Sequence, residues 1–232
     1  MNQRRTTAIV LTRVDYGEAD RILTVLTPDA GKLSLIAKGV RRVKSKLAGG
    51  IELFSTSEIS YLPGRGSVST LVSSRLIKHY GTIVQDIDRT MLGYELLKLL
   101  HKVTEDEPEG EYYHLLEQTF LALDDTTVSV DFTRMWFSAQ LIRLSGHTPN
   151  LRALADGTKL DASKRYEFDY DATAFITSRE GSGAFGANEI KLLRLIFSGN
   201  TPAVLHKVSD VAELTANIAP LILTLRQLHL RV

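Results

Sequence analysis

The chain has 232 residues, of which 44% are hydrophobic and 24% are charged. These are ordinary proportions for a globular protein, and they argue against a disordered or fibrous chain. The sequence contains no cysteine, which excludes disulfides, thiol catalysis and any cysteine-ligated zinc or iron–sulfur site. No apolar run approaches the roughly 20 residues that span a bilayer, and the first residues do not read as a signal peptide. We therefore expect a cytoplasmic protein with no membrane segment.

The formal net charge of +1 hides a strong asymmetry along the chain. Residues 1–80 contain 13 Lys and Arg against 6 Asp and Glu, whereas residues 81–232 contain 15 against 21. The first segment is therefore +7 and the second −6. A basic segment joined to an acidic one suggests that the first meets a polyanion and the second meets a different kind of partner.

The first 80 residues predict five short β-strands. Apolar and polar residues alternate along each strand, and turn-forming residues such as Pro28–Gly31 and Pro63–Gly66 separate them. The predicted strands are Thr7–Val14, Asp20–Thr27, Lys32–Lys38, Ile51–Leu62 and Val68–Leu76. Five strands with one longer connection at Gly39–Gly50 predict an OB-type barrel, with an SH3-like barrel as the alternative.

After Tyr80 the apolar spacing becomes helical. Helices are predicted at about residues 83–100, 112–123, 130–145, 188–198 and 209–232, with an acidic connector at 105–111 and a kink or interruption at Pro220. Residues 150–187 have poor periodicity and predict an irregular insert or small hairpin. The predicted fold is thus α+β, with a barrel domain at 1–80 and a mainly helical domain at 81–232 that contains the insert.

The connection between the third and fourth strands is the most informative segment for function. Residues 37–47 hold five cations and no anion. DNA phosphates would neutralise several of these cations and release counterions, whereas the alternative is an ordinary solvated loop. The predicted DNA-binding residues are Lys38, Arg41, Arg42, Lys44 and Lys46, extended by Arg65, Arg75 and Lys78. Because the feature that motivates this prediction is a cationic loop and not a base-reading helix, we expect binding to single- and double-stranded DNA with little sequence preference.

Aromatic side chains that could stack on bases are few in the predicted barrel. Residues 1–80 contain only four, which are Tyr16, Phe54, Tyr61 and Tyr80. Stacking contributes about 1–3 kcal/mol per base, so one or two exposed rings would matter. At least one of the four is expected in the core, and the sequence does not distinguish which are exposed.

No catalytic or metal-binding constellation is evident. The six histidines show no metal-ligand spacing, and the GSGAFG run at 181–186 lacks the Lys-Ser/Thr of a phosphate loop. The acidic pairs Asp124-Asp125 and Asp169/Asp171 have no third ligand or base nearby. We therefore predict a non-catalytic protein without metal or cofactor, and a nuclease is the enzyme class to be tested against this prediction.

Several short stretches are similar to the RecO family of DNA repair proteins. They are AIVL at 8–11, YGEAD at 16–20, LT at 26–27, GK at 31–32, AKGVRR at 37–42, SKL at 45–47 and LIRLSGHTPNL at 141–151. The resemblance implies an OB-fold followed by a helical domain, DNA binding and strand annealing in RecF-pathway recombination, cooperation with RecR, and contact with single-stranded DNA-binding protein. An OB-fold RNA-binding adaptor of another pathway is the alternative, since phosphate contacts do not identify the polymer.

The resemblance also implies a difference in metal binding. Many RecO-like proteins place a four-cysteine zinc module after the segment that matches Gly146–Leu151, but the positions around Ala153 and Asp156 are not cysteine here. We therefore expect the insert Ala153–Gly186 to keep the place of the module and to be stabilised by packing, without zinc.

The helical domain is expected to receive the protein partner. The tail of single-stranded DNA-binding protein is acidic and ends in an aromatic residue, so it calls for an apolar pocket rimmed by Arg or Lys. Arg134 and Arg143 lie on an apolar predicted helix, and Arg134 is the main candidate. An ordinary surface arginine is the competing interpretation.

Overall fold

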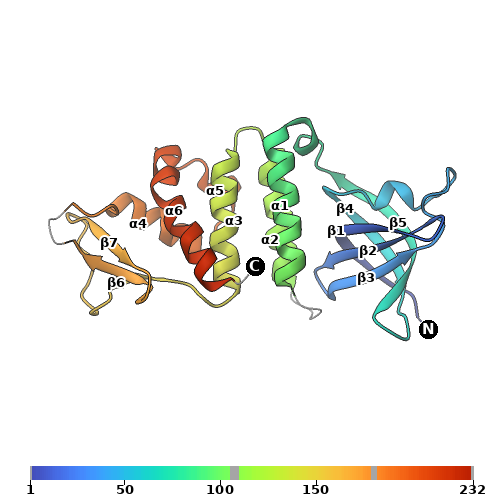
Figure 1. The fold of residues 1–232 in the computed structure, drawn as a ribbon. Helices are drawn as coiled ribbons and strands as arrows, with labels where there is room; N and C mark the ends of the chain where they lie inside the picture. The colour runs from blue at the N-terminus through green and yellow to red at the C-terminus, as the bar shows by residue number, and fades with distance from the viewer. Residues whose placement is uncertain (1, 105–109, 179–181, 231–232) are drawn as a thin grey trace. The chain divides into compact units, whose positions relative to one another are not determined.

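A computed structural model describes residues 2–104, 110–178 and 182–230, coloured along the chain in Figure 1. The chain forms two compact units, Met1–Thr126 and Thr127–Arg231, and each is described by itself. Most of the predicted acidic connector, residues 105–109, lies outside the described residues. Within the described ranges, no helix is long and apolar enough to cross a membrane.

The first unit begins with a closed five-stranded barrel. Its strands are β1 (Arg4–Tyr16), β2 (Asp20–Thr27), β3 (Gly31–Ala37), β4 (Ser55–Leu62) and β5 (Val68–His79), in the order β1-β2-β3-β5-β4. β3 and β5 are parallel, and all other neighbours are antiparallel. The prediction of an N-terminal five-stranded barrel followed by a helical region is confirmed.

The interior of the barrel follows from the alternation of its strands. The buried residues are Ala8, Val10, Leu23, Val25, Leu35, Ala37, Val40, Ile51, Ile59, Tyr61 and Leu71. Val40 and Ile51 come from the connection between β3 and β4, which also contains the short 3-10 helix η1 (Ala48–Gly50). β4 begins at Ser55 instead of the predicted Ile51, because the positive φ of Phe54, 54°, interrupts the extended backbone just before it.

Two helices complete the first unit. The 3-10 turn η2 (Ile83–Gln85) leads into α1 (Ile87–Val103), and α2 (Gly110–Asp124) follows. Both helices contact β1, so residues 8–11 of this strand are all buried instead of alternating. The domain boundary predicted at residue 80 followed the change of sequence pattern, whereas the compact unit continues through α2.

A close approach between barrel and helix explains one glycine of α1. A Cβ at Gly93 would lie 2.5 Å from the ring of Phe54, and the ring of Phe54 meets those of Tyr94 and Phe120 edge-on. The buried Arg89 donates hydrogen bonds to the carbonyl oxygens of Leu123 and Asp125 at 2.9 and 3.1 Å, which ties α1 to the end of α2.

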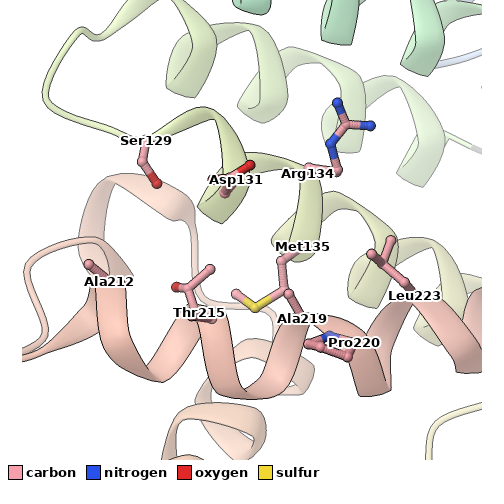
Figure 2. Close-up of a pocket in the computed structure, with 10 residues that line it drawn as sticks. Ser129, Asp131, Arg134, Met135, Ala212, Thr215, Ala219, Pro220 and Leu223 are labelled. Atoms are coloured by element: carbon pink, nitrogen blue, oxygen red, sulfur yellow. The ribbon is translucent and has the colours of Figure 1, made fainter.

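The second unit contains α3 (Val130–Leu144), α4 (Ala187–Phe197), α5 (Pro202–Leu205) and α6 (Val211–His229). α3 packs along α6, and Figure 2 shows Met135 between the two helices. Of the kink or interruption expected at Pro220, the interruption does not occur, because α6 continues through this residue. Pro220 and Ala216 are both exposed, so water can bond the Ala216 carbonyl that the missing N–H of Pro220 leaves open.

The predicted irregular insert is a small three-stranded sheet. Its strands are β6 (Asn150–Leu154), β7 (Tyr166–Asp169) and β8 (Ala174–Thr177), in the order β6-β8-β7. Tyr166, Phe175 and Phe185 are buried and in ring contact, and Arg165 donates to the carbonyl oxygens of Gly183 and Ala184. Among the residues that the structure describes, no group of three or more His, Asp or Glu side chains could hold a metal ion. The ring contacts and the hydrogen bonds of Arg165 connect the sheet to residues 183–185.

Candidate nucleic-acid interface

The connection between β3 and β4, which we call the basic loop (residues 38–54), carries five of the predicted cations. Lys38, Arg42, Lys44 and Lys46 are exposed and form no ion pair with any residue that the structure describes. Four unpaired cations on one loop repel one another in the absence of a polyanion. This part of the loop is therefore suited to phosphate contacts.

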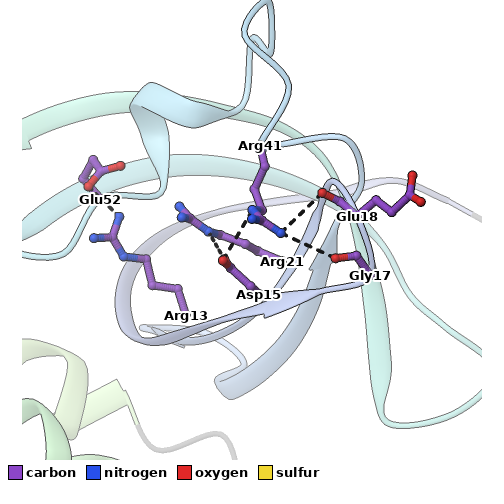
Figure 3. Close-up of polar contacts among 7 residues, drawn as sticks. All are labelled: Arg13, Asp15, Gly17, Glu18, Arg21, Arg41 and Glu52. Atoms are coloured by element: carbon purple, nitrogen blue, oxygen red, sulfur yellow. Dashed lines mark hydrogen bonds and ion pairs between the residues drawn. The ribbon is translucent and has the colours of Figure 1, made fainter.

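Arg41 differs from its neighbours because it has partners within the barrel. Its Nε lies 3.4 Å from Oδ2 of Asp15, and its Nη1 lies 3.5 and 3.3 Å from the carbonyl oxygens of Gly17 and Glu18, as Figure 3 shows. Its backbone N–H also donates to the carbonyl of Ala19 at 2.9 Å. Arg41 thus fastens the base of the basic loop to the β1–β2 turn, a role that the sequence did not indicate.

Asp15 is the acidic centre of this attachment. Its Oδ1 accepts a hydrogen bond from Nε of Arg21 at 2.8 Å, and Arg13 nearby pairs with Glu52 (Figure 3). The hydrogen bond from Arg21, together with the charge of Arg41, lowers the pKa of the Asp15 carboxyl below its ordinary value. Asp15 therefore stays ionised at neutral pH and holds the two arginines.

The remaining predicted cations lie in three different environments. Arg65, in the loop between β4 and β5, is exposed and has no ion pair within the described ranges. Arg75 pairs with Glu58 at 3.3 Å, and Arg5 pairs with the same carboxylate. The hydrogen bond from Arg5 is the main cause of the lowered pKa of Glu58. Lys78 places its Nζ 4.8 Å from the ring centroid of Tyr80. Arg65 is thus open to a phosphate, whereas Arg75 and Lys78 already have partners.

The structure resolves which aromatic residue of the barrel is accessible. Phe54, Tyr61 and Tyr80 are buried, and the Tyr80 hydroxyl lies 3.1 Å from Oγ1 of Thr56. Tyr16, at the end of β1, is 54% exposed. Among the four, Tyr16 is therefore the ring that could meet a base.

A second surface lies between α3 and α6, where a groove of about 420 Å³ is mostly apolar. We call it the α3–α6 groove, and its lining residues are Ser129, Asp131, Arg134, Met135, Ala212, Thr215, Ala216, Ala219, Pro220 and Leu223. The alanines at 212, 216 and 219 recur with helical spacing, so small side chains on one face of α6 leave the space. This spacing was the signal in the sequence that could have indicated the groove.

The two predicted protein-binding arginines differ in their relation to the groove. Arg134 is half-buried in its wall, although Figure 2 shows its guanidinium directed away from α6. Arg143 lies about two and a half turns further along α3, on the opposite face, and its Nε donates to Oε1 of Gln140 at 2.9 Å. Arg134 is therefore part of the wall of the groove, and Arg143 is not.

A closed five-stranded barrel with a basic loop, followed by helices, places the chain in the class of OB-type barrel proteins. The family model described as "Recombination protein O N terminal" matches residues 1–80, and "Recombination protein O C terminal" matches residues 84–230. The chain belongs to this family of DNA repair proteins, the RecO family.

Individual relatives agree with this assignment. A protein of Dehalococcoides mccartyi named "DNA repair protein RecO" is 32% identical over 86% of this chain and 80% of its own length. Proteins of the same name from Rubrobacter xylanophilus and Rhodopirellula baltica are 31% and 33% identical, over 66% and 68% of this chain. The matched regions span 61% and 59% of those two relatives, so this chain aligns with only part of them.

Proposed function

We propose that this chain is a cytoplasmic, non-catalytic recombination mediator that binds single- and double-stranded DNA and anneals complementary strands. The observation that carries the proposal is the set of exposed cations on the barrel that have no acidic partner among the described residues. Five of these cations lie in loops, and they are Lys38, Arg42, Lys44, Lys46 and Arg65. Each can neutralise a phosphate and release a counterion, which is the main source of sequence-independent affinity.

Annealing follows from the same physical chemistry. Two complementary strands repel each other through their phosphates, and this repulsion falls when cations neutralise the backbones. The basic loop is fastened at one end by Arg41 and Asp15 and at the other by the buried Ile51, while Arg42, Lys44 and Lys46 between these attachments project into solvent. This arrangement lets the cations follow the backbone of a strand without reading its bases.

The α3–α6 groove is our proposed site for the C-terminal tail of single-stranded DNA-binding protein. The mostly apolar groove provides space for the terminal aromatic side chain, and Arg134 provides a charge-assisted hydrogen bond to a carboxylate. Cooperation with RecR is part of the proposal through membership of the RecO family, whose relatives are named as DNA repair proteins. Those names also favour DNA over RNA as the polymer.

The proposal is tested by measuring binding of the purified chain to labelled single strands, duplex DNA and RNA of one length at several salt concentrations. Five phosphate contacts predict a log–log slope of about −3.5 on single strands and about −4.5 on duplex B-DNA. In the same buffers, the chain should accelerate annealing of complementary strands and leave labelled strands uncut in magnesium. A salt slope near zero, tighter binding to RNA than to DNA, or cleavage would contradict the proposal.

A further inference from the structure

The ring of Tyr16 lies outside the hydrophobic core of the barrel. It is 54% exposed, and Val14, two residues before it on the same face of β1, is 60% exposed. The barrel interior is filled by other residues, and neither side chain belongs to it. An exposed aromatic ring beside an exposed valine forms a small apolar patch at the end of the strand.

The patch continues as a row across the outer face of the sheet. Val14 on β1 pairs with Ile22 on β2, Ile22 with Ile36 on β3, and Ile36 with Thr70 on β5. All four are at least partly exposed, whereas the neighbouring Leu23 and Leu35 point into the barrel. The row contains no charged side chain. It therefore forms an uncharged surface that begins at Val14, next to Tyr16 on the same face of β1.

The base of the basic loop is hydrogen-bonded to the β1–β2 turn and the start of β2, directly after Tyr16. The backbone N–H of Gly39 donates to Oδ1 of Asp20 at 2.7 Å, and Asp20 is the residue that pairs with Tyr16 across the β1–β2 ladder. Arg41 bonds the same turn through Ala19, Gly17 and Asp15. Lys38 and Arg42 are the chain neighbours of Gly39 and Arg41, so their backbone is held against the turn that follows Tyr16.

We propose that Tyr16 stacks on a base of a single strand while Lys38 and Arg42 contact the flanking phosphates. This inference rests on the proposed function and adds a preference for unpaired strands. In a duplex the faces of the bases are already stacked on their neighbours, so Tyr16 contributes only when a base is free. Arg41 and Asp15 are positioning residues that keep the ring and the cations together.

The test compares Tyr16→Ala, Tyr16→Phe and the control Tyr170→Ala, which removes an exposed tyrosine from the other unit. The probes are a thymine oligonucleotide, an abasic strand of the same length, and a duplex. A stacking contribution of about 1–3 kcal/mol corresponds to a loss of roughly 5- to 150-fold. We expect this loss for Tyr16→Ala on the thymine strand, with an unchanged salt slope, and near wild-type affinity for Tyr16→Phe and Tyr170→Ala.

The abasic strand separates stacking from a folding defect, because it keeps the phosphates and lacks the bases. Wild type and Tyr16→Ala should bind the abasic strand and the duplex equally well, so the difference between them appears only on the thymine strand. Equal losses on all three probes, or no loss on the thymine strand, would overturn the role of Tyr16 and leave the proposed DNA binding intact. Absence of wild-type binding to every probe would instead contradict the proposed function itself.

Discussion

The basic loop and the α3–α6 groove are built from opposite kinds of residue. The loop presents Arg42, Lys44 and Lys46 to solvent between its two attachments to the barrel. The groove presents alanines, Pro220 and Leu223 on helices packed along their length. A charged ligand on the loop is bound with strong salt dependence, while an apolar ligand in the groove is bound by area removed from water. Under the proposed function, this difference separates two partners by the physical kind of interaction, and the predictions below test that separation.

The largest expected effect is loss of DNA binding when the unpaired loop cations are removed together. Changing Lys38, Arg42, Lys44 and Lys46 to alanine should reduce the single-strand salt slope by about 2.8 and affinity by a hundredfold or more, on the order expected for four phosphate contacts. Because these side chains are exposed, the melting temperature should stay near that of wild type. Fluorescence anisotropy at four or five salt concentrations, with a melting curve, measures both. An unchanged slope would show that the loop is only solvated.

The groove should respond to a different set of changes. Replacing Ala216 with Phe fills the groove and should reduce binding of a tail peptide of single-stranded DNA-binding protein at least tenfold, with DNA affinity unchanged. Arg134→Ala should weaken the peptide about tenfold, through loss of one charge-assisted hydrogen bond.

The matched control for the groove is Arg143→Ala, because Arg143 lies on the opposite face of the same helix. It should bind the fluorescent peptide like wild type. If Arg143→Ala weakens the peptide as much as Arg134→Ala, the ligand does not lie in the groove, and if wild type does not bind the peptide, this partner is removed from the proposal.

Within the loop, Arg41 and Arg42 should behave differently although they are neighbours. Arg42→Ala should lower the single-strand salt slope by about 0.7 and leave the fold unchanged. Arg41→Ala should leave the slope closer to that of wild type but increase amide hydrogen exchange at residues 15–21 and 38–42, since it releases the loop from Asp15. Equal slopes and equal exchange in the two variants would contradict the positioning role of Arg41.

A smaller effect is expected in acid. The pKa values of Asp15 and Glu58 are lowered in the folded protein, so the stability that they contribute is complete above their ordinary pKa values and is lost as pH falls through the lowered ones. The contribution of these two carboxyls to the melting temperature should therefore stay constant between about pH 7 and 5, and it should decline below about pH 4. Asp15→Asn should make the decline shallower. A titration of melting temperature in which this variant follows wild type at every pH would exclude the contribution of Asp15.

The smallest effect, no change at all, is expected from metal removal. The sheet β6-β8-β7 is held by Tyr166, Phe175 and Phe185, so a chelator should leave the melting temperature unchanged. As a positive control, Phe175→Ala removes a fully buried ring and should destabilise the second unit by about 3–5 kcal/mol. One tightly bound zinc per chain, found by metal analysis, would overturn the prediction.

The sequence by itself determined the kinds of element and much of their extent. Period-two alternation over most of their length predicted the five strands, because a half-buried strand places every second side chain inward. The change to helical spacing after Tyr80, and the Gly-Pro stop signals after Leu144, marked the helices for the same local reason. The concentration of cations at 38–46 and the absence of cysteine were likewise visible without coordinates.

Tertiary structure alone decided which of these residues are available to a ligand. Arg41 and Arg42 are equivalent in the sequence, but only Arg41 meets Asp15, because the β1–β2 turn lies against the base of the loop. Tyr16 and Tyr61 both occur on strands, yet Tyr61 fills the barrel and Tyr16 faces outward. The physical reason is that period and composition are local properties, whereas burial and pairing depend on segments that closure of the barrel and packing of α3 on α6 bring together from distant parts of the chain.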